Sequence, residues 1–589
     1  MFYPIMGSSG SGKTHYILQK AGELALRGEK VIVIVPEQFS FETERSAYRL
    51  FGAEAALNIE VLSFTRLCSK VFYTYGGVAG EYISEVAKQT VISLAVGELA
   101  DKLEIYSSAV KNPTFAVTIL GAIEEFKNAG ILPEQVAQTA LEIKSSSLSS
   151  KLAELSEIYA VYKAMIDLGY LDSKDDLSRC VKMLEGHNFF SEYTVLIDSF
   201  MTYMAGEYAL INHIVGEAKN TYITFICNSL TEQSGEMGVF SVAVKTAGRI
   251  IKMAKASAVE VHTPIKLTEC PRFENAELAF LQQEYPQQIP EHYPDKVSAI
   301  KLVEAKDPYD EIAYVAATIC KLVREDGMRY KDIAVIARNL ARFGTAVEDI
   351  FERYGIPVFA DKRDDLLAVP LVRGILAALD AIDKGFETQS LIAFAKSTLM
   401  GLSALEVASL ENYCYIWNTK GAAWKNEFTA NPNGLSDRFS DKDRKQLDEI
   451  NVTRDKLIKP LITLRETVKS CTGKGFSTAI YSFLTEIHAT ENMKAYLERN
   501  DDISGRYIHL NNGAWEIIME ILNIFARIIG DKTLPTGQYI QLFKNAITAS
   551  DLGSIPHTLD QTIVGIADRI RPNAPKVTFV IGANEGLFP

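Results

Sequence analysis

The sequence lacks the cysteine pattern of a disulfide framework or a zinc site. It has seven cysteines, and no two of them form a C-x-x-C pair. They stand at Cys68, Cys180, Cys227, Cys270, Cys320, Cys414 and Cys471. An odd number of scattered thiols is typical of reduced side chains in a cytoplasmic protein. The eight histidines are dispersed as well, and no pair of them has the spacing of metal ligands.

Long apolar runs and an excess of basic residues are also missing. No run of eighteen apolar residues occurs, so we expect no membrane span. The N-terminus has no basic segment followed by an apolar core, which argues against a signal peptide. The formal net charge is −13. A chain this acidic is not a typical nucleic-acid binder, although a groove can be locally basic on an acidic protein.

The chain has 589 residues, of which 47% are hydrophobic and 23% charged. This balance is that of a soluble globular protein with about three to five domain-sized units. Strand patterns and helical periodicity alternate in two separate parts of the sequence. The first part has a strand at 2–6, a helix from 13 to about 27, and the β-branched run VIVIV that is typical of a buried parallel strand. Its further predicted strands begin at 59, 193 and 221, and purely helical patterns fill 83–186.

The same arrangement repeats in the second half. Strands are predicted at 299–306, 332–339 and 356–361, with a helix between the first two. A long helical region follows at about 371–552, and strand patterns return in QTIVGIADRI and KVTFVIGANEGLFP. The last of these strands, 577–581, looks buried and only eight residues follow it. Such a strand normally needs more of the sheet to cover it, which suggests a truncated chain.

We therefore predict an α/β protein with two parallel-sheet cores, each carrying an all-helical insertion. The predicted first core is 1–80 and 188–295, with its insertion at 81–187. The predicted second core is 296–370 and 553–589, with its insertion at 371–552.

A phosphate-binding loop opens the chain. The stretch GSSGSGKT fits the pattern G-x-x-x-x-G-K-[ST] and lies between a predicted strand and a predicted helix. Backbone N–H groups of such a loop turn toward a phosphate chain, and the start of the helix adds partial positive charge. The residues expected to hold ATP are Gly7, Ser8, Ser9, Gly10, Ser11, Gly12, Lys13 and Thr14. Within this set, Lys13 is expected to reach the β- and γ-phosphates, and the Thr14 hydroxyl to hold Mg²⁺.

A second metal-side carboxylate is expected at the end of a neighbouring strand. In VLIDSF, Asp198 has that position, although an Asp there could instead cap the next helix. Ser199 follows where many P-loop motors have a glutamate that orients the attacking water, and a serine cannot act as a carboxylate base. Glu207 lies further along, but nothing in the sequence places it near the phosphates.

Other polar and aromatic residues follow predicted strands. Arg338 ends a strand of the second core and could face a γ-phosphate as an arginine finger does, or could be a surface side chain. The aromatic side chains of Phe64, Phe200 and Tyr203 could stack on bases of single-stranded DNA, or could belong to the core. The last two candidates for contacts with nucleic-acid phosphates or the nucleotide, Arg569 and Arg571, could equally lie in a solvated loop.

Several motifs together resemble those of the AddB family, the second subunits of bacterial AddAB helicase–nucleases. They are GSSGSGKT, VIVIVPEQFSFETER, VLSFTRLCSKVF, VLIDSFMTYMAGEY and, near the end, VTFVIGANEGLFP. The resemblance spans the chain with its motifs in family order, and PEQFSFETE is the most family-specific of them.

The resemblance implies two RecA-like cores related to those of UvrD-like superfamily-one helicases. It further implies ATP and Mg²⁺ as ligands, an AddA-type motor subunit as partner, and contact with single- and double-stranded DNA during double-strand-break processing and recombination-signal recognition. The family also has a C-terminal nuclease domain with a [4Fe-4S] cluster, whose ligands we do not find in this chain. We therefore expect an N-terminal AddB half in the cytoplasm, with no membrane contact and no nuclease activity of its own.

Three functions are compared on this basis. The first is a DNA-contacting subunit whose P-loop binds ATP with little hydrolysis. The second is an active ATP-driven translocase on single-stranded DNA, which Ser199 disfavours. The third is a small-molecule P-loop kinase, which the twofold occurrence of the α/β pattern disfavours.

Overall fold

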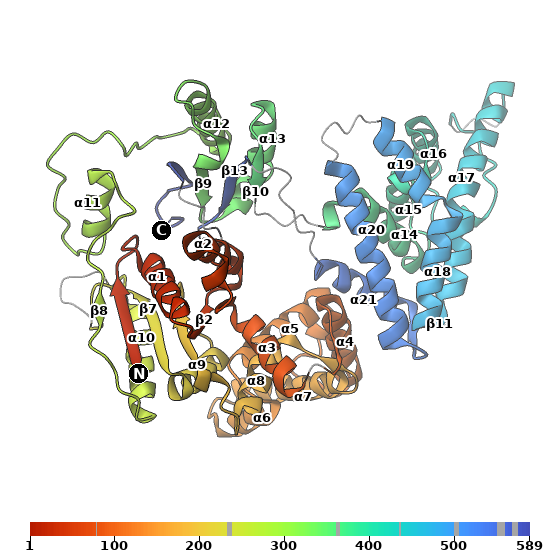
Figure 1. Cartoon of the computed structure of the whole chain (residues 1–589). Coiled ribbons are helices and arrows are strands. Elements are labelled where there is room, and N and C mark those ends of the chain that lie inside the picture. Colours follow the sequence, from red (N-terminus) through yellow and green to blue (C-terminus); the bar gives the residue numbers. More distant parts are fainter. Residues whose placement is uncertain are drawn as a thin grey trace. The chain divides into compact units, whose positions relative to one another are not determined.

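The computed structural model describes residues 1–77, 79–231, 238–360, 366–434, 438–499, 506–550, 560–567, 570 and 575–588 (Figure 1). The chain divides into two compact units. The first consists of Met1–Ile83, Leu99–Ser108 and Thr118–Leu302, and the second of Ser84–Glu98, Ala109–Val117 and Val303–Pro589. Each unit contains one parallel sheet of four or more strands, and each is described below by itself.

The sheet of the first unit is six-stranded, with the order β3-β2-β6-β7-β1-β8. All neighbouring strands in it pair in parallel. The strands are β1 (Phe2–Gly7), β2 (Lys30–Ile34), β3 (Ile59–Leu62), β6 (Tyr193–Ile197), β7 (Asn220–Ile226) and β8 (Ile265–Lys266). The short strand β8 was not predicted from the sequence, because two residues carry no periodicity.

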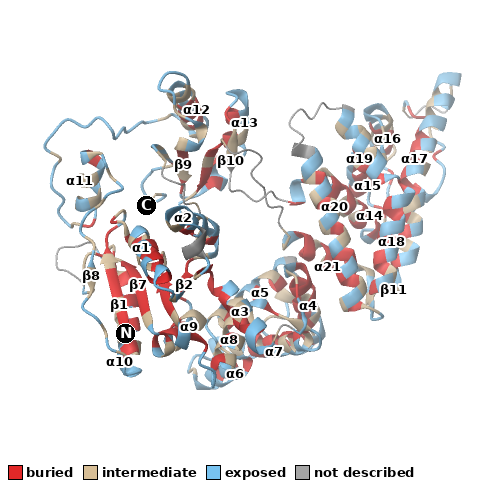
Figure 2. Cartoon of the chain, in the orientation of Figure 1, coloured by how far each residue is buried: buried red, intermediate tan, exposed pale blue. Residues whose placement is uncertain are grey.

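Helices cover both faces of this sheet. On one face, α1 (Lys13–Leu26) and α2 (Glu37–Ala56) pack over Val31, Val33 and their neighbours. On the other face, Ile32 and Ile34 pack with α3 (Phe64–Tyr75), α8 (Asp176–Leu184), α9 (Ala205–Glu217) and α10 (Ser241–Ala256). The strands are accordingly buried on both sides, as the red arrows of Figure 2 show. The run VIVIV was correctly predicted as a doubly covered strand.

Further helices of the N-terminal half follow β3 in the chain. They are α4 (Glu85–Leu99), α5 (Pro113–Asn128), α6 (Pro133–Glu142) and α7 (Ser146–Asp167), and a short parallel pair joins β4 (Glu81–Tyr82) to β5 (Tyr170–Leu171). The first unit also contains α11 (Ala276–Glu284). The Glu277 carboxylate of α11 accepts hydrogen bonds from the backbone N–H groups of Ser298, Ala299 and Ile300 at 2.7–3.2 Å.

The predicted strand at 299–306 is wrong. The structure has no strand among these residues, and the side chain of Leu302 is 98% exposed. The apolar residues of AIKLVEAK resembled those of a strand, but the backbone donors at 298–300 bond to Glu277 rather than to a neighbouring strand.

The second unit has a four-stranded parallel sheet with the order β10-β13-β9-β14. Its strands are β9 (Ile333–Ala337), β10 (Val358–Ala360), β13 (Thr562–Ile566) and β14 (Val577–Ile581). Helices α12 (Pro308–Arg324) and α13 (Ala346–Arg353) pack on one face. The expectation that 577–581 is a buried central strand is corrected, because β14 lies at an edge and Val580 is 47% exposed.

Helices fill most of the region between β10 and β13. They are α14 (Pro370–Asp383), α15 (Thr388–Ala395), α16 (Ala404–Ile416), α17 (Asp441–Val468), α18 (Gly473–Glu486), α19 (Ala489–Arg499), α20 (Arg506–Ile524) and α21 (Thr536–Thr548). A two-stranded antiparallel pair, β11 (Ser470–Thr472) with β12 (Thr533–Pro535), accompanies them.

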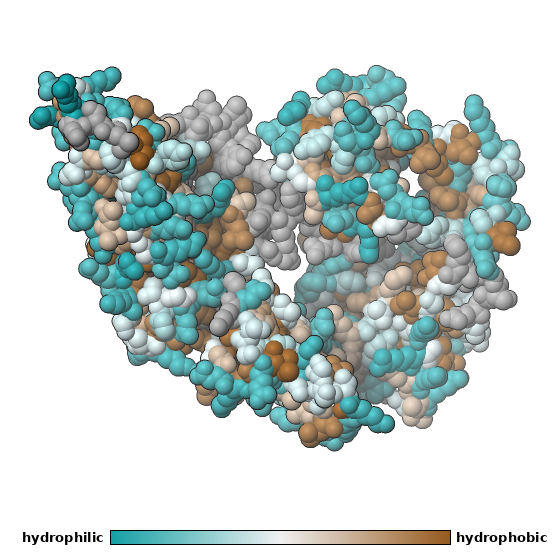
Figure 3. Space-filling model, turned by 180° about the vertical axis from the view of Figure 1, so that it is seen from behind, coloured by the Kyte–Doolittle hydropathy of each residue, from teal (hydrophilic) through white to brown (hydrophobic). Residues whose placement is uncertain are grey.

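The structure thus confirms an α/β protein with parallel sheets and many helices. The four-part division at residues 80, 187, 295, 370 and 552 stays a prediction. Within the described residues, no helix combines the length and the apolar character needed to cross a membrane. Hydrophilic residues cover much of the face seen in Figure 3, interspersed with smaller hydrophobic areas.

Candidate nucleotide-binding site

The glycine-rich stretch forms a tight loop at the carboxyl end of β1. Strand β1 ends at Gly7 and helix α1 begins at Lys13. Gly10 and Gly12 have φ angles of +83° and +80°, a left-handed conformation that strains any residue with a Cβ atom. The loop sequence therefore supplies glycine where the backbone turns into the helix.

Close contacts explain why side chains are excluded from this loop. A Cβ atom on Gly7 would lie 2.2 Å from Ser11 Oγ and 3.0 Å from the carbonyl oxygen of Leu267. A Cβ atom on Gly10 would lie 3.1 Å from both Arg272 Cβ and Phe273 Cε2. The Ser11 hydroxyl oxygen is buried and has no hydrogen-bond partner. A buried polar atom of this kind usually has a partner, so the loop retains an unused hydrogen-bonding group.

Lys13 lies inside the loop. Its ammonium group donates hydrogen bonds to the carbonyl oxygens of Gly7 and Ser8, at 2.8 and 2.7 Å. The side chain is 9% exposed. Burial lowers the pKa of Lys13 to about 8, although the nearby Asp198 carboxylate acts in the opposite direction. An ammonium group held in this way is a buried cation at the start of a helix, which is what a polyphosphate requires.

Three hydroxyl groups donate to the Asp198 carboxylate. Thr14 Oγ1 lies 2.7 Å from Oδ2, Ser199 Oγ lies 3.0 Å from the same oxygen, and Thr224 Oγ1 lies 2.6 Å from Oδ1. Asp198 follows β6 and its backbone N–H donates to the Ile34 carbonyl oxygen at 2.9 Å. Asp198 and Thr224 are each 2% exposed. The structure therefore places the predicted pair, Thr14 and Asp198, in direct contact.

Ser199 has an unusual backbone conformation. Its φ angle is +70°, and a non-glycine residue in the left-handed region at a functional site is commonly strained. Glu207 serves as a helix cap, since its carboxylate accepts a hydrogen bond from the Met204 backbone N–H at 2.7 Å. Burial raises the pKa of Glu207, and the hydrogen bond from Met204 opposes this shift.

The segment after β8 lies on the loop, and sequence analysis missed it. Cys270 Sγ is 3.3 Å from Ser8 Oγ, and the positive charge of Arg272 contributes to the lowered pKa of Lys13 after the larger effect of burial. Pro271 Cγ would lie 3.6 Å from a Cβ atom on Gly12. Strand β8 pairs with β1 at Ile5 and Met6, which holds this segment next to the loop. No local sequence signal could reveal this contact, because about 260 residues separate the partners.

The three predicted DNA-stacking aromatics lie together. Ring centroids of Phe64 and Phe200 are 5.3 Å apart, and those of Phe200 and Tyr203 are 5.1 Å apart. Phe64 is 5% exposed and Tyr203 is 7% exposed. Most of their ring surface is therefore used in the core, and Phe200, which is half-buried, has the most surface left. A role in base stacking stays a prediction.

The predicted arginines are only partly described. Arg338 is exposed and directly follows β9 in the second unit. Its role as an arginine finger stays a prediction. Arg569 and Arg571 lie outside the described residues. In the part of the chain that the structure describes, no group of three His, Cys, Asp or Glu side chains is arranged to hold a metal ion.

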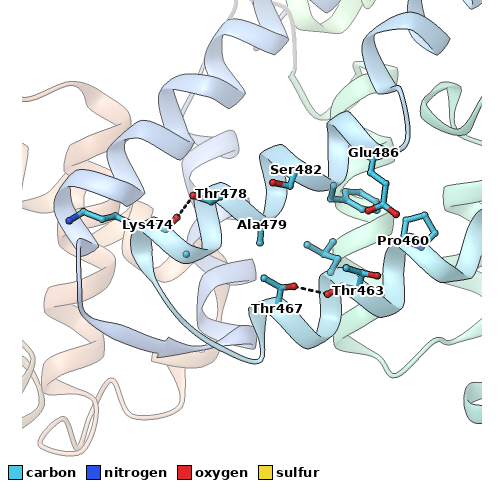
Figure 4. Close-up of a pocket in the computed structure, with 11 residues that line it drawn as sticks. Pro460, Thr463, Thr467, Lys474, Thr478, Ala479, Ser482 and Glu486 are labelled. Atoms are coloured by element: carbon cyan, nitrogen blue, oxygen red, sulfur yellow. Dashed lines mark hydrogen bonds between the residues drawn. The ribbon is translucent and has the colours of Figure 1, made fainter.

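A hollow of about 480 Å³ lies between α17 and α18 of the second unit (Figure 4). Threonines line it, but Thr467 donates to the Thr463 carbonyl oxygen at 2.8 Å and Thr478 to that of Lys474 at 2.9 Å. Their hydroxyl protons are used within their own helices, so the hollow has little of the directed polarity of a ligand site.

Comparison with known proteins gives two family matches. The family described as "ADDB, N-terminal" matches residues 4–282, and the family described as "UvrD-like helicase C-terminal domain" matches residues 272–556. The B-type subunit of the ATP-dependent helicase/deoxyribonuclease of Ruminiclostridium cellulolyticum is 29% identical over 603 residues, covering 99% of this chain and 52% of that protein. Its counterparts in Acetivibrio thermocellus and Caldanaerobacter subterraneus are 28% and 27% identical, covering 99% of this chain and 52% and 51% of those proteins. The chain thus spans about half the length of the curated relatives it matches.

Proposed function

Since this chain is AddB-like along its whole length, as its motifs indicated, we propose that it is the ATP-binding, DNA-contacting portion of a helicase–nuclease subunit. In this proposal the subunit acts in double-strand-break processing and recombination-signal recognition, together with an AddA-type motor subunit in the cytoplasm. The observation that carries the proposal is the single site formed by the glycine loop, Lys13, Thr14 and Asp198.

The site fits ATP·Mg²⁺ by its donor set. The buried, unpartnered Ser11 hydroxyl and the left-handed glycines provide polar groups and backbone room for phosphate oxygens. Thr14 and Asp198 provide hard oxygen ligands, which Mg²⁺ prefers. When bound, Mg²⁺ neutralises phosphate charge. Lys13 would exchange its bonds to the Gly7 and Ser8 carbonyls for phosphate oxygens, while Thr224 keeps the Asp198 carboxylate in place.

Binding without rapid hydrolysis is the form of the proposal that the site supports best. Hydrolysis needs a group that orients the attacking water. Ser199 instead donates its hydroxyl to Asp198, and Glu207 caps α9. Both residues are thus engaged in other contacts.

Two further elements of the proposal rest on the fold and the family. In the first sheet one strand, β7, separates the P-loop strand β1 from the Asp198 strand β6, an order that supports a RecA-like core. The matching UvrD-like family supports a second such core. The [4Fe-4S] cluster and the nuclease activity are assigned to the remaining length of the family rather than to this chain.

Nucleotide binding tests the proposal. Lys13→Ala should abolish the ATP·Mg²⁺-induced rise in melting temperature, because it removes the buried cation of the loop. With ligand at 100 times its Kd, the wild-type chain should gain about 2.7 kcal/mol of stability. Lys20→Ala is the matched control, since Lys20 lies on the same helix and pairs with Glu23 at the surface.

Turnover distinguishes the alternatives. We expect negligible ATP hydrolysis by the wild-type chain, with or without single-stranded DNA. Hydrolysis at several per second, stimulated by single-stranded DNA and lost in Lys13→Ala, would establish the translocase instead. Phosphoryl transfer to a small acceptor would establish the kinase. An unchanged melting temperature with ATP in the wild type would refute nucleotide binding.

A further inference from the structure

Helix α10 carries an unbalanced row of positive charge. Its sixteen residues include Lys245, Arg249, Lys252 and Lys255 and contain no Asp or Glu. All four basic side chains are exposed. The whole chain has a net charge of −13, so the charge of this helix is opposite in sign to that of the protein as a whole.

The helical repeat places the four residues on one face. Spacings of four, three and three residues keep side chains in register at 3.6 residues per turn. The buried residues of α10, among them Ala243, Ala247 and Ile250, pack against the sheet from the other side of the helix. The row extends for about 15 Å, given a rise of about 1.5 Å per residue. We call these four side chains the α10 basic row.

No carboxylate neutralises the row among the described residues. Lys245, Lys252 and Lys255 form no hydrogen bond or ion pair through their side chains there, and the Arg249 guanidinium lies 3.8 Å from the centroid of the Tyr208 ring. Elsewhere on the surface, lysines commonly pair along their helices. Examples are Lys163 with Asp167 and Lys459 with Asp455.

The row therefore differs from an ordinary solvated helix face. Like charges at spacings of three and four residues destabilise an isolated helix. The Arg249 guanidinium already stacks on the Tyr208 ring, so it would lose less conformational entropy on binding an anion than a side chain without such a contact.

We infer that the α10 basic row binds the phosphate backbone of double-stranded DNA. A duplex presents about one negative charge per 1.7 Å of helix axis, and basic side chains that contact it release condensed counterions. Surfaces for single strands combine basic side chains with aromatic rings on which bases stack. Helix α10 has no aromatic residue, so its surface is suited to contacts with the phosphate backbone and not to stacking on bases. The choice of DNA as the polyanion rests on the proposed function.

The test compares two charge-neutralised variants of the full chain. The first is Lys245→Gln/Lys252→Gln/Lys255→Gln, which leaves Arg249 on Tyr208. The control is Lys442→Gln/Arg444→Gln/Lys445→Gln on α17, where three exposed basic residues stand between Asp441 and Asp448 and flank Asp443. The two variants lose the same charge, so a general change of net charge affects both equally.

The probe is a blunt fluorescein-labelled 30-base-pair duplex, followed by anisotropy from 50 to 200 mM salt. Each lost phosphate contact should lower the slope of log Kobs against log[salt] by about 0.9, or about 2.7 for the triple variant. Affinity at 50 mM salt should fall at least about tenfold, while the control should match the wild type. The ATP·Mg²⁺-induced melting shift should be unchanged in both variants, which separates this inference from the nucleotide site.

An α10 variant whose duplex affinity and salt slope equal those of the control would overturn the inference. The same unchanged affinity and salt slope would be measured if the α10 basic row bound an acidic protein surface instead of DNA. A loss confined to a single-stranded probe of equal length would overturn the assignment to duplex DNA.

Discussion

Replacing Thr224 by valine should reveal how strongly the buried carboxylate of Asp198 depends on its hydroxyl donors. Thr224 Oγ1 donates to Asp198 Oδ1 at 2.6 Å, and both side chains are 2% exposed. Valine has nearly the same shape, so packing against the neighbouring strands is retained. A hydrogen bond to a charged group contributes about 1.5–3 kcal/mol, and an unsatisfied buried acceptor retains its desolvation penalty. We therefore expect Thr224→Val to lower the free energy of unfolding by about 2 kcal/mol.

The same strand supplies a matched control. Thr221 is also buried in β7, but its hydroxyl has no hydrogen-bond partner. Thr221→Val removes a buried polar group that makes no bond, so its effect on stability should be neutral or favourable. Thr224→Ser keeps the hydroxyl donor to Asp198, so it should recover much of the stability that Thr224→Val loses.

Two measurements follow this series. Urea unfolding gives the free energies, and calorimetric titration gives the affinity for ATP·Mg²⁺. Loss of a residue that orients a metal ligand typically weakens metal binding by about 10–100-fold, so Thr224→Val should weaken ATP·Mg²⁺ binding by about tenfold while Thr221→Val leaves it unchanged. If both valine variants lose the same stability and affinity, the contribution of Thr224 is packing and the argument from the hydrogen bond is wrong.

Three further changes test other parts of the first unit. Lys127→Met should lower the free energy of unfolding, measured in urea, by about 3–5 kcal/mol, because it removes the ammonium group that lies 2.6 Å from the buried Asp172 carboxylate. The exposed pair of Lys163 with Asp167 is the comparison and should contribute less than about 1 kcal/mol. Gly10→Ala should reduce the ATP-induced melting shift, since a Cβ atom would meet Arg272 and Phe273. Gly28 has a similar positive φ but lies in open space, so Gly28→Ala should affect stability alone. For Glu277, burial favours the neutral acid, but hydrogen bonds from the backbone of 298–300 outweigh it and lower the pKa. Its stabilisation is therefore present above the pKa of the unfolded chain and lost as pH falls through the lower folded pKa, so Glu277→Gln should flatten the acid side of the stability–pH profile.

The sequence was sufficient for features that short stretches encode. The P-loop lies between a strand and a helix as predicted, and Asp198 meets Thr14 although 184 residues separate them. This contact was predictable because the carboxyl ends of parallel strands share one edge of a sheet. The hydrophobic pattern also identified β2 correctly as a strand covered on both faces.

Features that depend on distant backbone contacts were not predictable. In the sequence, Thr224 looks like any other strand residue. The strand order of the folded sheet places it against Asp198. The segment at Cys270 and Arg272 reaches the loop through the two-residue strand β8, which has no pattern of its own. The pattern at 299–306 predicted a strand wrongly, because apolar residues show which side chains could be buried but not whether a partner strand exists.

Lys13 and Thr14 of the proposed nucleotide site already have hydrogen-bond partners within the protein, and this limits how tightly the site would bind a ligand. Lys13 uses the carbonyl oxygens of Gly7 and Ser8, and Thr14 uses Asp198. A ligand that takes up these groups must first break their present bonds, so it gains only the difference between two sets of hydrogen bonds. On the proposed function, nucleotide binding is therefore an exchange of hydrogen-bond partners. Cys270 and Arg272 lie against the Gly7–Lys13 segment, so we expect them to be the first residues outside the loop to respond to such an exchange.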